Sequence, residues 1–449
     1  MGMQSKGGHV REKSGIYWKN QRRGREIMGK VYFIILDGAA DRPVKMLSNR
    51  TPLKAARKPH LDSLACRGQQ SMIKILPEGF VPESDSGAMA LLGYDPMNYY
   101  CGRGMLESLG VGVGLDYKYH AGFRINFATL NEKRSNLLDR RVARGLSAEE
   151  LQELTSEIVN GVRLDNSEKV RFHLHTFGSF RGILSFYSDE ISLTGNVSNT
   201  DPAYRKEGFF SIPVENYPSA LLPCKAKDES KASENTARLV NLFSKQCMEI
   251  LGSSQVNRKR ILEGKMPANC ILVRDGGSSR IQMPDFKERY GKTLSIFGQL
   301  PCEKALAQLI GAHFYYTWSF DKQGDGVYLR DLAKVLYQDE SDIVFCHLKG
   351  PDEPGHDKEP FKKVEAIEII DQYFIGEIRR NLTGSDRVVV TCDHATPCEL
   401  GVHSDDAVPL LLYGSGISKD SSISFDEKSA ECGSCPVKEA TKIMDYIKG

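Results

Sequence analysis

Three apolar runs that lie far apart in the chain each lead to an acidic residue. The pairs are residues 31–36 (VYFIIL) with Asp37, residues 343–346 with Asp352, and residues 388–391 with Asp393. An uninterrupted apolar run is typical of a strand that is covered on both faces, as in a parallel sheet. Because ligands of open α/β sheets bind beyond the carboxyl ends of the strands, this pattern predicts one site assembled from distant segments.

The regions between these runs differ along the chain. Residues 147–150 (SAEE) form a capping box that predicts a helix ending at Gly161, and apolar residues between 364 and 374 share one face of another helix. From about 117 to 290, strand-like runs are shorter and polar stretches are more frequent. We therefore predict an α/β core with a mainly parallel sheet flanked by helices, formed by residues 30–116 and 291–449. Residues 117–290 are predicted to form an inserted α+β domain.

The composition is that of an ordinary globular chain, with 449 residues, 40% apolar and 26% charged residues and a net charge of +2. Residues 1–30 hold eight basic and two acidic side chains, which leaves −4 for the remainder. We interpret residues 1–29 as a disordered extension, with a basic arm for nucleic acid or membranes as the alternative. Since no stretch has the apolar run of a signal peptide or a membrane span, we expect a cytoplasmic protein that binds neither nucleic acid nor membranes.

The eleven cysteines are an odd number scattered over the chain. Such a distribution predicts free thiols in a reducing compartment. Cys432 and Cys435 form a CxxC pair, for which a redox or zinc half-site is the alternative. A zinc site needs a second pair, and none has the required spacing.

Three histidines stand close to acidic residues in short motifs. Asp352 and His356 stand four residues apart, and Asp393 and His394 stand side by side. The third histidine, His403, follows nine residues after His394. Carboxylate and imidazole together are ligands for Zn²⁺, Mn²⁺ or Fe²⁺, whereas an all-oxygen set favours Mg²⁺ or Ca²⁺. With the residue that follows the first strand, six groups are available, enough for two metal ions. They are Asp37, Asp352, His356, Asp393, His394 and His403.

Ser84 lies in a short polar segment, residues 82–87 (PESDSG), between two apolar ones. A hydroxyl at a helix N-terminus near two cations has a lowered pKa and can attack phosphorus. Two metals about 4 Å apart stabilise both oxygens of an in-line phosphoryl displacement. Taken singly, a serine such as Ser84 is more often an N-cap, and a histidine or aspartate is more often an ordinary hydrogen-bonded group. Their combination favours metal-assisted phosphoryl transfer.

Several short motifs, in the same order along residues 30–449, resemble those of a known family. They are residues 37–43 (DGAADRP), 51–53 (TPL), 84–85 (SD), 93–96 (GYDP), 100–104 (YCGRG), 123–129 (FRINFAT), 139–141 (DRR), 200–202 (TDP) and 393–397 (DHATP). This set resembles the archaeal-type cofactor-independent phosphoglycerate mutases of the alkaline phosphatase superfamily. The resemblance implies an alkaline-phosphatase-like core, an inserted lid, and an isomerase that interconverts 3-phosphoglycerate and 2-phosphoglycerate.

The resemblance also implies roles for individual residues. Ser84 would be the nucleophile that is transiently phosphorylated, so that no 2,3-bisphosphoglycerate is needed. Two divalent metal ions are implied, usually manganese and sometimes zinc or cobalt. One ion would be held by Asp37, Ser84, Asp393 and His394, and the other by Asp352, His356 and His403. The oligomeric state is not implied.

Cationic groups of the lid are implied to bind the carboxylate and phosphate of the substrate, a task that suits the planar guanidinium. The candidate substrate-binding residues are Arg124, Arg141, Arg181, Asp201, Arg274 and Lys304. Each arginine is alternatively a salt-bridge partner.

Three substrate-facing segments depart from the family pattern. Residues 83–88 read ESDSGA where the family commonly has GSDTAH, Phe180-Arg181 stands for His-Arg, and Arg274-Asp275 stands for Arg-Gly. These changes leave an alternative function for the chain. It would be a related phosphotransferase or phosphohydrolase that acts on another small phosphorylated metabolite, such as a homoserine-kinase-like enzyme. A non-catalytic relative is disfavoured, because all seven metal and nucleophile residues are present.

Overall fold

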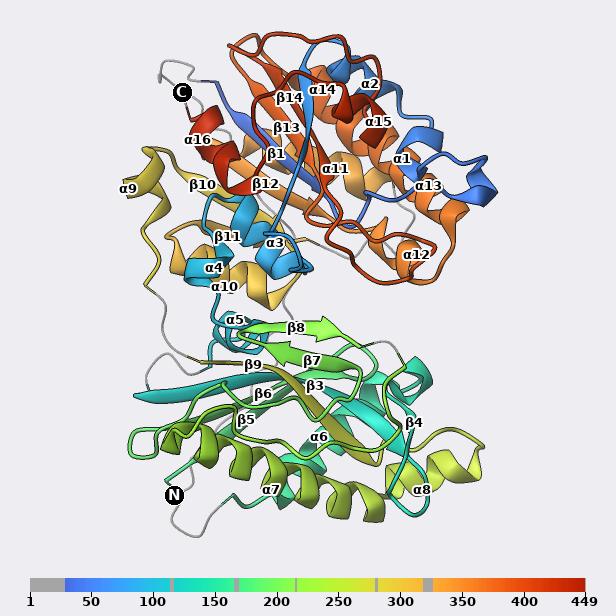
Figure 1. Cartoon of the computed structure of the whole chain (residues 1–449), viewed down its shortest axis with the longest axis vertical. Coiled ribbons are helices and arrows are strands. Elements are labelled where there is room, and N and C mark those ends of the chain that lie inside the picture. The colour runs from blue at the N-terminus through green and yellow to red at the C-terminus, as the bar shows by residue number, and fades with distance from the viewer. Residues whose placement is uncertain are drawn as a thin grey trace, which may run out of the picture.

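The computed structural model describes residues 29–113, 117–164, 169–214, 216–278, 282–317 and 326–448. Two units are stacked along its longest axis (Figure 1). We call the elements around the seven-stranded sheet the large-sheet unit, and those around the five-stranded sheet the small-sheet unit. The predicted disordered extension, residues 1–29, lies outside the described residues except for Gly29.

The large sheet has the strand order β11-β10-β12-β1-β13-β14-β2. Its strands are β1 (Val31–Leu36), β2 (Gln69–Ile73), β10 (Leu294–Gly298), β11 (His313–Tyr316), β12 (Ile343–Leu348), β13 (Arg387–Thr391) and β14 (Val408–Gly414). Strands β11, β10, β12, β1 and β13 are parallel to one another, whereas β14 pairs antiparallel with both β13 and β2. The three strands predicted from apolar runs are β12, β1 and β13, which lie next to one another at the centre of the sheet.

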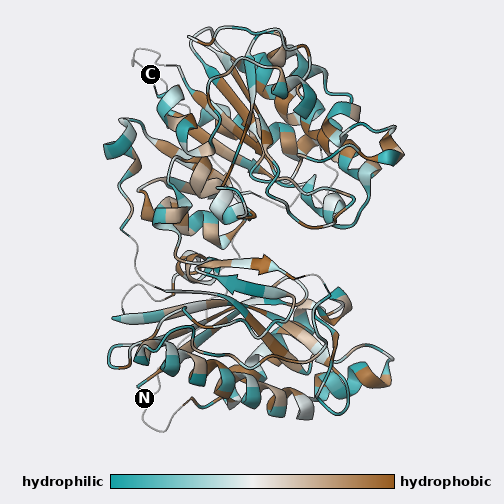
Figure 2. Cartoon of the chain, in the orientation of Figure 1, coloured by the Kyte–Doolittle hydropathy of each residue, from teal (hydrophilic) through white to brown (hydrophobic). Residues whose placement is uncertain are grey.

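Helices cover both faces of this sheet (Figure 1). They are α1 (Pro52–Ala55), α2 (Pro59–Ala65), α3 (Ser84–Leu91), α4 (Pro96–Tyr99), α5 (Arg103–Gly110), α9 (Phe286–Tyr290), α10 (Pro301–Leu309), α11 (Gly326–Gln338), α12 (Asp352–His356), α13 (Pro360–Ile369), α14 (Gly376–Asn381), α15 (Glu427–Glu431) and α16 (Ile443–Ile447), with short turns η1 (Lys45–Leu47) and η5 (Ala440–Lys442). The predicted helix over 364–374 is α13 continued by a π-helical turn, η4 (Ile370–Ile375). Apolar strands fill the interior (Figure 2), where Phe33, Val344 and Val390 are fully buried. The predicted fold class, an α/β unit with a mainly parallel sheet and a second α+β unit, is confirmed.

The small-sheet unit is built on an antiparallel sheet with its own apolar core. The strands of this sheet are β3 (Tyr119–Leu130), β4 (Leu137–Asp139), β5 (Arg171–Phe177), β6 (Arg181–Ser188) and β9 (Cys270–Ser278). The unit also contains a hairpin of β7 (Tyr204–Glu207) and β8 (Phe210–Pro213). Its helices are α6 (Ala148–Gly161), α7 (Lys231–Ser253) and α8 (Gln255–Leu262), and its short turn is η2 (Val142–Arg144). The predicted capping box opens α6, because the Ser147 hydroxyl accepts from Glu150 N and the Glu150 carboxylate accepts from Ser147 N.

Two details fix how the units meet. Helix α5 packs directly on β3, since a Cβ added to Gly104 would lie 2.5 Å from the Cα of Phe123. After β9, the side chains of Met283, Phe286 and Tyr290 join the core of the large-sheet unit. The predicted boundary at 290/291 therefore falls inside the packing of the large sheet, and we propose to place it after Ser278.

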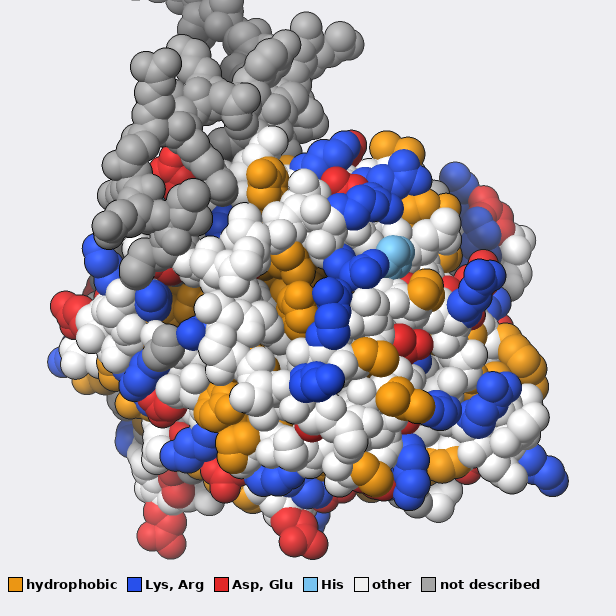
Figure 3. Space-filling view, turned by 90° about the horizontal axis from the view of Figure 1, so that it is seen from above, with side chains coloured by type: hydrophobic (Ala, Val, Ile, Leu, Met, Phe, Trp, Pro, Cys, Tyr) orange, Lys and Arg blue, Asp and Glu red, His pale blue; other side chains and the backbone are white. Residues whose placement is uncertain are grey.

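No helix in the described part of the chain is long and apolar enough to cross a membrane. The end of the large-sheet unit seen in Figure 3 carries basic, acidic and apolar side chains side by side. All eleven cysteines are free thiols, as predicted. Cys432 is exposed and Cys435 is buried, and neither belongs to a potential metal-binding group among the described residues.

Candidate active site

The acidic residues predicted to converge lie at one edge of the large sheet. Asp37 follows β1, Asp352 begins α12 shortly after β12, and Asp393 follows β13. Because these parallel strands are neighbours, their carboxyl ends deliver the three side chains to the same place. Helices α3, which begins at Ser84, and α12 lie on the side of this unit that faces the small-sheet unit (Figure 1).

The first group of potential ligands is fully buried. It consists of Asp37, Asp393 and His394, whose candidate ligand atoms all lie within 4.8 Å of one another. His394 Nε2 is 3.2 Å from Asp393 Oδ2, 3.4 Å from Asp37 Oδ1 and 3.5 Å from Ser84 Oγ. Asp37 Oδ1 and Asp393 Oδ2 accept no hydrogen bond from any described residue. Buried carboxylate oxygens without donors are costly, so this donor set fits a divalent cation.

The second group is half-buried and consists of Asp352, His356 and His403. The two Nε2 atoms are 3.1 Å apart, and each lies 3.5 Å from an Asp352 oxygen. On the other side of the rings, His356 Nδ1 donates to Gly401 O at 2.9 Å and His403 Nδ1 to Pro82 O at 3.2 Å. A carbonyl oxygen can only accept, so both Nδ1 atoms carry a proton and both Nε2 atoms are directed toward each other and toward Asp352. This arrangement is typical of histidine metal ligands.

The two groups adjoin each other. The rings of His394, from the first group, and His403, from the second, stack with their centroids 3.7 Å apart. Burial alone would raise the pKa of Asp393, but His394 and His347 hold it well below the usual range. Burial and the Asp37 charge would raise the pKa of Asp352, but His403 and His394 lower it. Both carboxyl groups are therefore ionised, as a carboxylate metal ligand must be.

Three residues that sequence reasoning missed stand behind the first group. Lys349 Nζ donates to Asp37 Oδ2 at 2.8 Å, and His347 Nε2 lies 3.2 Å from Asp393 Oδ2. The other nitrogen of His347 contacts Glu303 Oε1 at 2.5 Å. His347 and Lys349 follow the apolar run of β12 directly, a signal that could have been used. Glu303 lies on α10, where no local pattern distinguishes it from an ordinary helix residue.

The structure places Lys304, a predicted substrate-binding residue, beside an aromatic ring. Its ammonium is 5.8 Å from the centre of the Tyr316 ring, while the neighbouring Glu303 reaches the site.

Residues 82–87, which contain the predicted nucleophile Ser84, are called the nucleophile loop. This loop is in electrostatic contact with arginines of both units. Arg103 donates to Glu83 Oε2 at 2.6 Å and to Glu107 Oε1 at 2.9 Å. Burial would raise the pKa of Glu83, but His403, Arg103, Arg124 and Arg274 lower it to about 2. The arginines of the small-sheet unit therefore face the residue that precedes Ser84.

Two of the predicted substrate-binding arginines are neutralised by carboxylates. Arg274 contacts Asp275 at 2.6 Å and Asp201 at 3.9 Å. Arg124 lies 3.3 Å from Glu107 and 3.7 Å from Asp275. The predicted substrate ligand Asp201 is itself buried against a further arginine of the same unit. These three residues form a buried ion-pair network, and their role in substrate binding stays a prediction.

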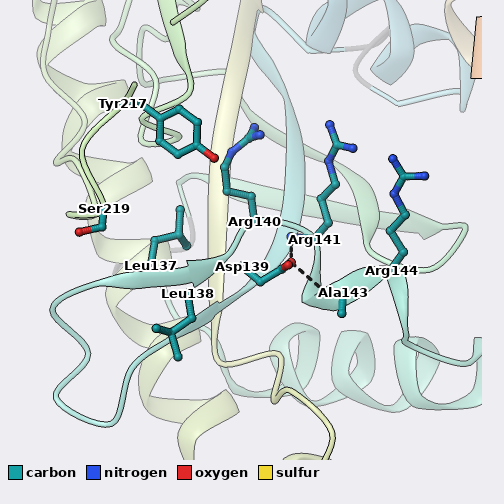
Figure 4. Close-up of a pocket in the computed structure, with 9 residues that line it drawn as sticks. All are labelled: Leu137, Leu138, Asp139, Arg140, Arg141, Ala143, Arg144, Tyr217 and Ser219. Carbon is teal, nitrogen blue, oxygen red and sulfur yellow. Dashed lines mark hydrogen bonds between the residues drawn. The ribbon is translucent and has the colours of Figure 1, made fainter. Parts of the chain in front are cut away.

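The other two predicted arginines have no carboxylate partner among the described residues. Arg141 and Arg181 lie over the ring of Phe180, with guanidinium carbons 6.0 Å and 5.1 Å from its centroid. Burial, together with neighbouring arginines, lowers the pKa of Arg181 to about 10. Arg141 also lines an open pocket of about 550 Å³, in which it and Arg144 extend in the same direction (Figure 4). Uncompensated positive charge makes these two arginines the ones available to an anionic ligand.

Comparison with known proteins identifies the family. The model of the 2,3-bisphosphoglycerate-independent phosphoglycerate mutases matches residues 65–257. A mutase of that name from Aeropyrum pernix is 37% identical, over 85% of this chain and 90% of the relative. The chain belongs to this family of mutases. A second family member, from Saccharolobus islandicus, is 34% identical over 92% of this chain and 96% of its own length.

Solved structures agree with the family assignment. The cofactor-independent phosphoglycerate mutase from Thermoplasma acidophilum has a TM-score of 0.60 at 26% identity, covering 94% of this chain and 99% of its own. A protein from Pyrococcus horikoshii has a TM-score of 0.72 at 27% identity, covering 94% and 97%. The resemblance inferred from short motifs is thus confirmed at the level of the mutase family.

Proposed function

We propose that this chain is a phosphoglycerate mutase that interconverts 3-phosphoglycerate and 2-phosphoglycerate through a phosphoserine on Ser84, without 2,3-bisphosphoglycerate. Family membership supports this reaction. The structural observation that carries the proposal is the position of Ser84 Oγ, 3.5 Å from His394 Nε2 and next to two potential metal-binding groups.

Two divalent cations, with manganese as the first candidate and zinc or cobalt as alternatives, complete the proposed site. Asp37, Ser84, Asp393 and His394 would hold one ion. Asp352, His356 and His403 would hold the other. When bound, the ions supply positive charge to the attacking and leaving oxygens of the phosphoryl transfer.

The residues of the chain carry the remaining tasks. Ser84 Oγ forms a bond to phosphorus while the bond from phosphorus to the 3-oxygen of the substrate breaks, and the proton of the Ser84 hydroxyl ends on that oxygen. The glycerate then turns, and its 2-oxygen attacks phosphorus and releases Ser84, whose Oγ takes up the proton that the 2-hydroxyl loses. Because Ser84 begins α3, the positive end of the helix favours the charge of the phosphoryl group. Arg141 and Arg181 would hold the free anionic end of the substrate during the turn.

A small phosphorylated metabolite is the only partner that this function requires. A cytoplasmic location remains part of the proposal, as does the role of residues 117–278 as a lid.

One observation favours the alternative function, a phosphotransferase or phosphohydrolase that acts on another small phosphorylated metabolite. Glu83 and Asp275, which stand at two departures from the family pattern, pair with Arg103 and Arg274 at 2.6 Å each. They reduce the positive charge available to a doubly anionic substrate such as phosphoglycerate.

An enolase-coupled assay tests the mutase against this alternative. Purified protein is given 3-phosphoglycerate and Mn²⁺ but no bisphosphoglycerate, and absorbance of phosphoenolpyruvate is followed. Sustained turnover is expected. No turnover by protein shown to contain metal would exclude the mutase, and a panel of phosphate esters would then identify the alternative substrate.

A further inference from the structure

The hairpin of β7 and β8 contacts the large-sheet unit beside the nucleophile loop. Phe210, the first residue of β8, is half-buried. Its ring stacks on Tyr100 with centroids 4.9 Å apart and meets the edge of Phe80 at 5.2 Å. Figure 1 shows this hairpin on the side of the small-sheet unit that faces the other unit. Among the aromatic contacts between described residues, these two join the units.

One further side chain connects this contact to the nucleophile. The hydroxyl of Tyr100 donates to Asp85 Oδ2 at 2.7 Å, and both residues are buried. Asp85 follows Ser84 directly, and its other oxygen accepts from Ser86 N at 2.8 Å. The ring on which Phe210 rests is therefore hydrogen-bonded to the first turn of the helix that presents Ser84.

The hairpin is anchored to the small-sheet unit by Lys206 and Ser211, which pair with each other next to its turn. The ammonium of Lys206, on β7, donates to Gly195 O and to Gly276 O, the carbonyl next to Asp275. Asn199 Nδ2 donates to Ser211 Oγ at 3.1 Å on β8. Because the hairpin is tied to the strand that bears Arg274, the seat of Phe210 also fixes where the buried ion-pair network stands relative to Ser84.

Helix α5 also joins the units, through its packing on β3 and through Glu107, which lies 3.3 Å from Arg124. Away from this helix, a further contact between the units is weak. Arg144 and Asp357 approach to 3.9 Å, with side chains 45% and 46% exposed. Exposed ion pairs contribute little to an equilibrium. The apolar seat of Phe210 between Phe80 and Tyr100 is therefore a stronger contact than this ion pair.

We propose that Phe210 is a positioning residue, a latch that seats the small-sheet unit over the nucleophile loop and keeps water from phosphorylated Ser84. This inference rests on the proposed mutase function. When the latch opens, a water oxygen bonds to phosphorus and the bond between phosphorus and Ser84 Oγ breaks. The proton that the water loses ends on Oγ, which yields inorganic phosphate and free serine.

The test compares Phe210→Ala with Phe209→Ala in the full-length, Mn²⁺-loaded protein. Phe209 is the adjacent residue in the same hairpin and is 39% exposed, so it is the matched control. With 3-phosphoglycerate as substrate, 2-phosphoglycerate and inorganic phosphate are measured together. We expect Phe210→Ala to raise the ratio of phosphate released to 2-phosphoglycerate formed about tenfold, equivalent to about 1.4 kcal/mol in the latch equilibrium. Phe209→Ala should keep the wild-type ratio.

An unchanged ratio in folded Phe210→Ala, or an equal rise in both variants, would overturn the latch. If Phe210→Ala does not fold, Phe210→Leu and Phe80→Ala test the same contact from its two sides. Both are expected to raise the ratio, and wild-type ratios in both would refute the proposal.

Hydrogen exchange separates this proposal from the mutase function, because it needs no substrate. Phe210→Ala should speed amide exchange in residues 204–213 and 82–87, and Phe209→Ala should not. Protein that shows this difference but no turnover of 3-phosphoglycerate would keep the latch contact and reject the mutase. Exchange that is the same in both variants would reject the latch whatever the turnover.

Discussion

His356 Nε2 and His403 Nε2 lie 3.1 Å apart although the residues are 47 positions apart in the chain. Each ring donates its Nδ1 proton to a backbone carbonyl, so both Nε2 atoms converge beside the Asp352 carboxylate. Two imidazole nitrogens and a carboxylate that converge in this way form a potential metal-binding group.

His356→Ala should lower metal affinity at the half-buried group. Even the loss of a residue that only supports a ligand weakens metal binding about 10- to 100-fold, so we expect a loss of at least about 100-fold here. Metal content after dialysis, measured by mass spectrometry, gives the number of ions retained. His313→Ala, at an exposed histidine on β11, is the control and should retain the wild-type content. Full activity of chelator-treated wild-type protein would contradict the metal site.

Ser84→Ala should abolish the phosphoenzyme. Intact-protein mass spectrometry after brief mixing with 3-phosphoglycerate should show a phosphate adduct in the wild type and none in the variant. Ser86→Ala is the matched control, because the Ser86 hydroxyl accepts from Glu83 N at 3.0 Å and does not belong to either metal group. It should lower stability by about 1 kcal/mol through the lost cap and still form the adduct. An adduct on the Ser84 variant would place the nucleophile elsewhere.

Glu83→Gln should lower KM for phosphoglycerate. The change removes a negative charge that lies next to Ser84 and 3.8 Å from His403 Nδ1, and it frees Arg103 from one of its two carboxylates. Removing a negative charge beside the proposed phosphate site is worth about 1 kcal/mol, which corresponds to a KM about fivefold lower. Initial rates against substrate concentration give KM, with Glu78→Gln at an exposed position as the control. A higher KM would instead mean that Glu83 holds Arg103 in place for the substrate.

The partnered and unpartnered arginines should respond differently to substitution. Arg181→Gln removes an uncompensated charge, so KM should rise about tenfold while the free energy of unfolding changes by no more than about 0.5 kcal/mol. Arg274→Gln leaves the buried Asp275 and Asp201 without this partner and should cost about 3 kcal/mol of stability. Urea unfolding and steady-state kinetics on both variants separate the two effects. The interpretation fails if Arg181→Gln unfolds the protein or Arg274→Gln leaves its stability unchanged.

The buried carboxyl group of Glu427 should make the free energy of unfolding depend on pH, independently of the active site. Burial raises its pKa to about 7, although Thr51 Oγ1 and Asp41 N donate to the carboxylate. The unfolded chain loses this proton near pH 4.3. The folded protein therefore binds more protons between these values. The resulting stabilisation is complete below the unfolded pKa and is lost as pH rises to about 7, by up to about 3 kcal/mol.

Urea unfolding at pH 5, 6 and 7 measures this slope. Glu427→Gln should flatten it, whereas Glu431→Gln, exposed on the same helix, should not. Parallel pH profiles for the wild type and Glu427→Gln would contradict the assignment.

Local sequence determined the strands and their acidic ends. The runs at 31–36, 343–346 and 388–391 are apolar throughout because their strands are buried on both faces, and parallel pairing then carries Asp37, Asp352 and Asp393 to one edge. The histidines stand within a few residues of these acids or in the loop that follows, so short motifs were enough to select both potential metal-binding groups.

Only the tertiary structure decided which charges are free and how the units touch. Nothing near Arg124 in the sequence distinguishes it from Arg181, yet Arg124 lies against the buried carboxylates of Glu107 and Asp275 and Arg181 against the ring of Phe180. Glu303 reaches His347 across 44 positions, and Phe210 reaches Tyr100 across the interface of the two units. The charge state and contacts of a side chain depend on distances to segments remote in the chain, and those distances exist only once the chain has folded.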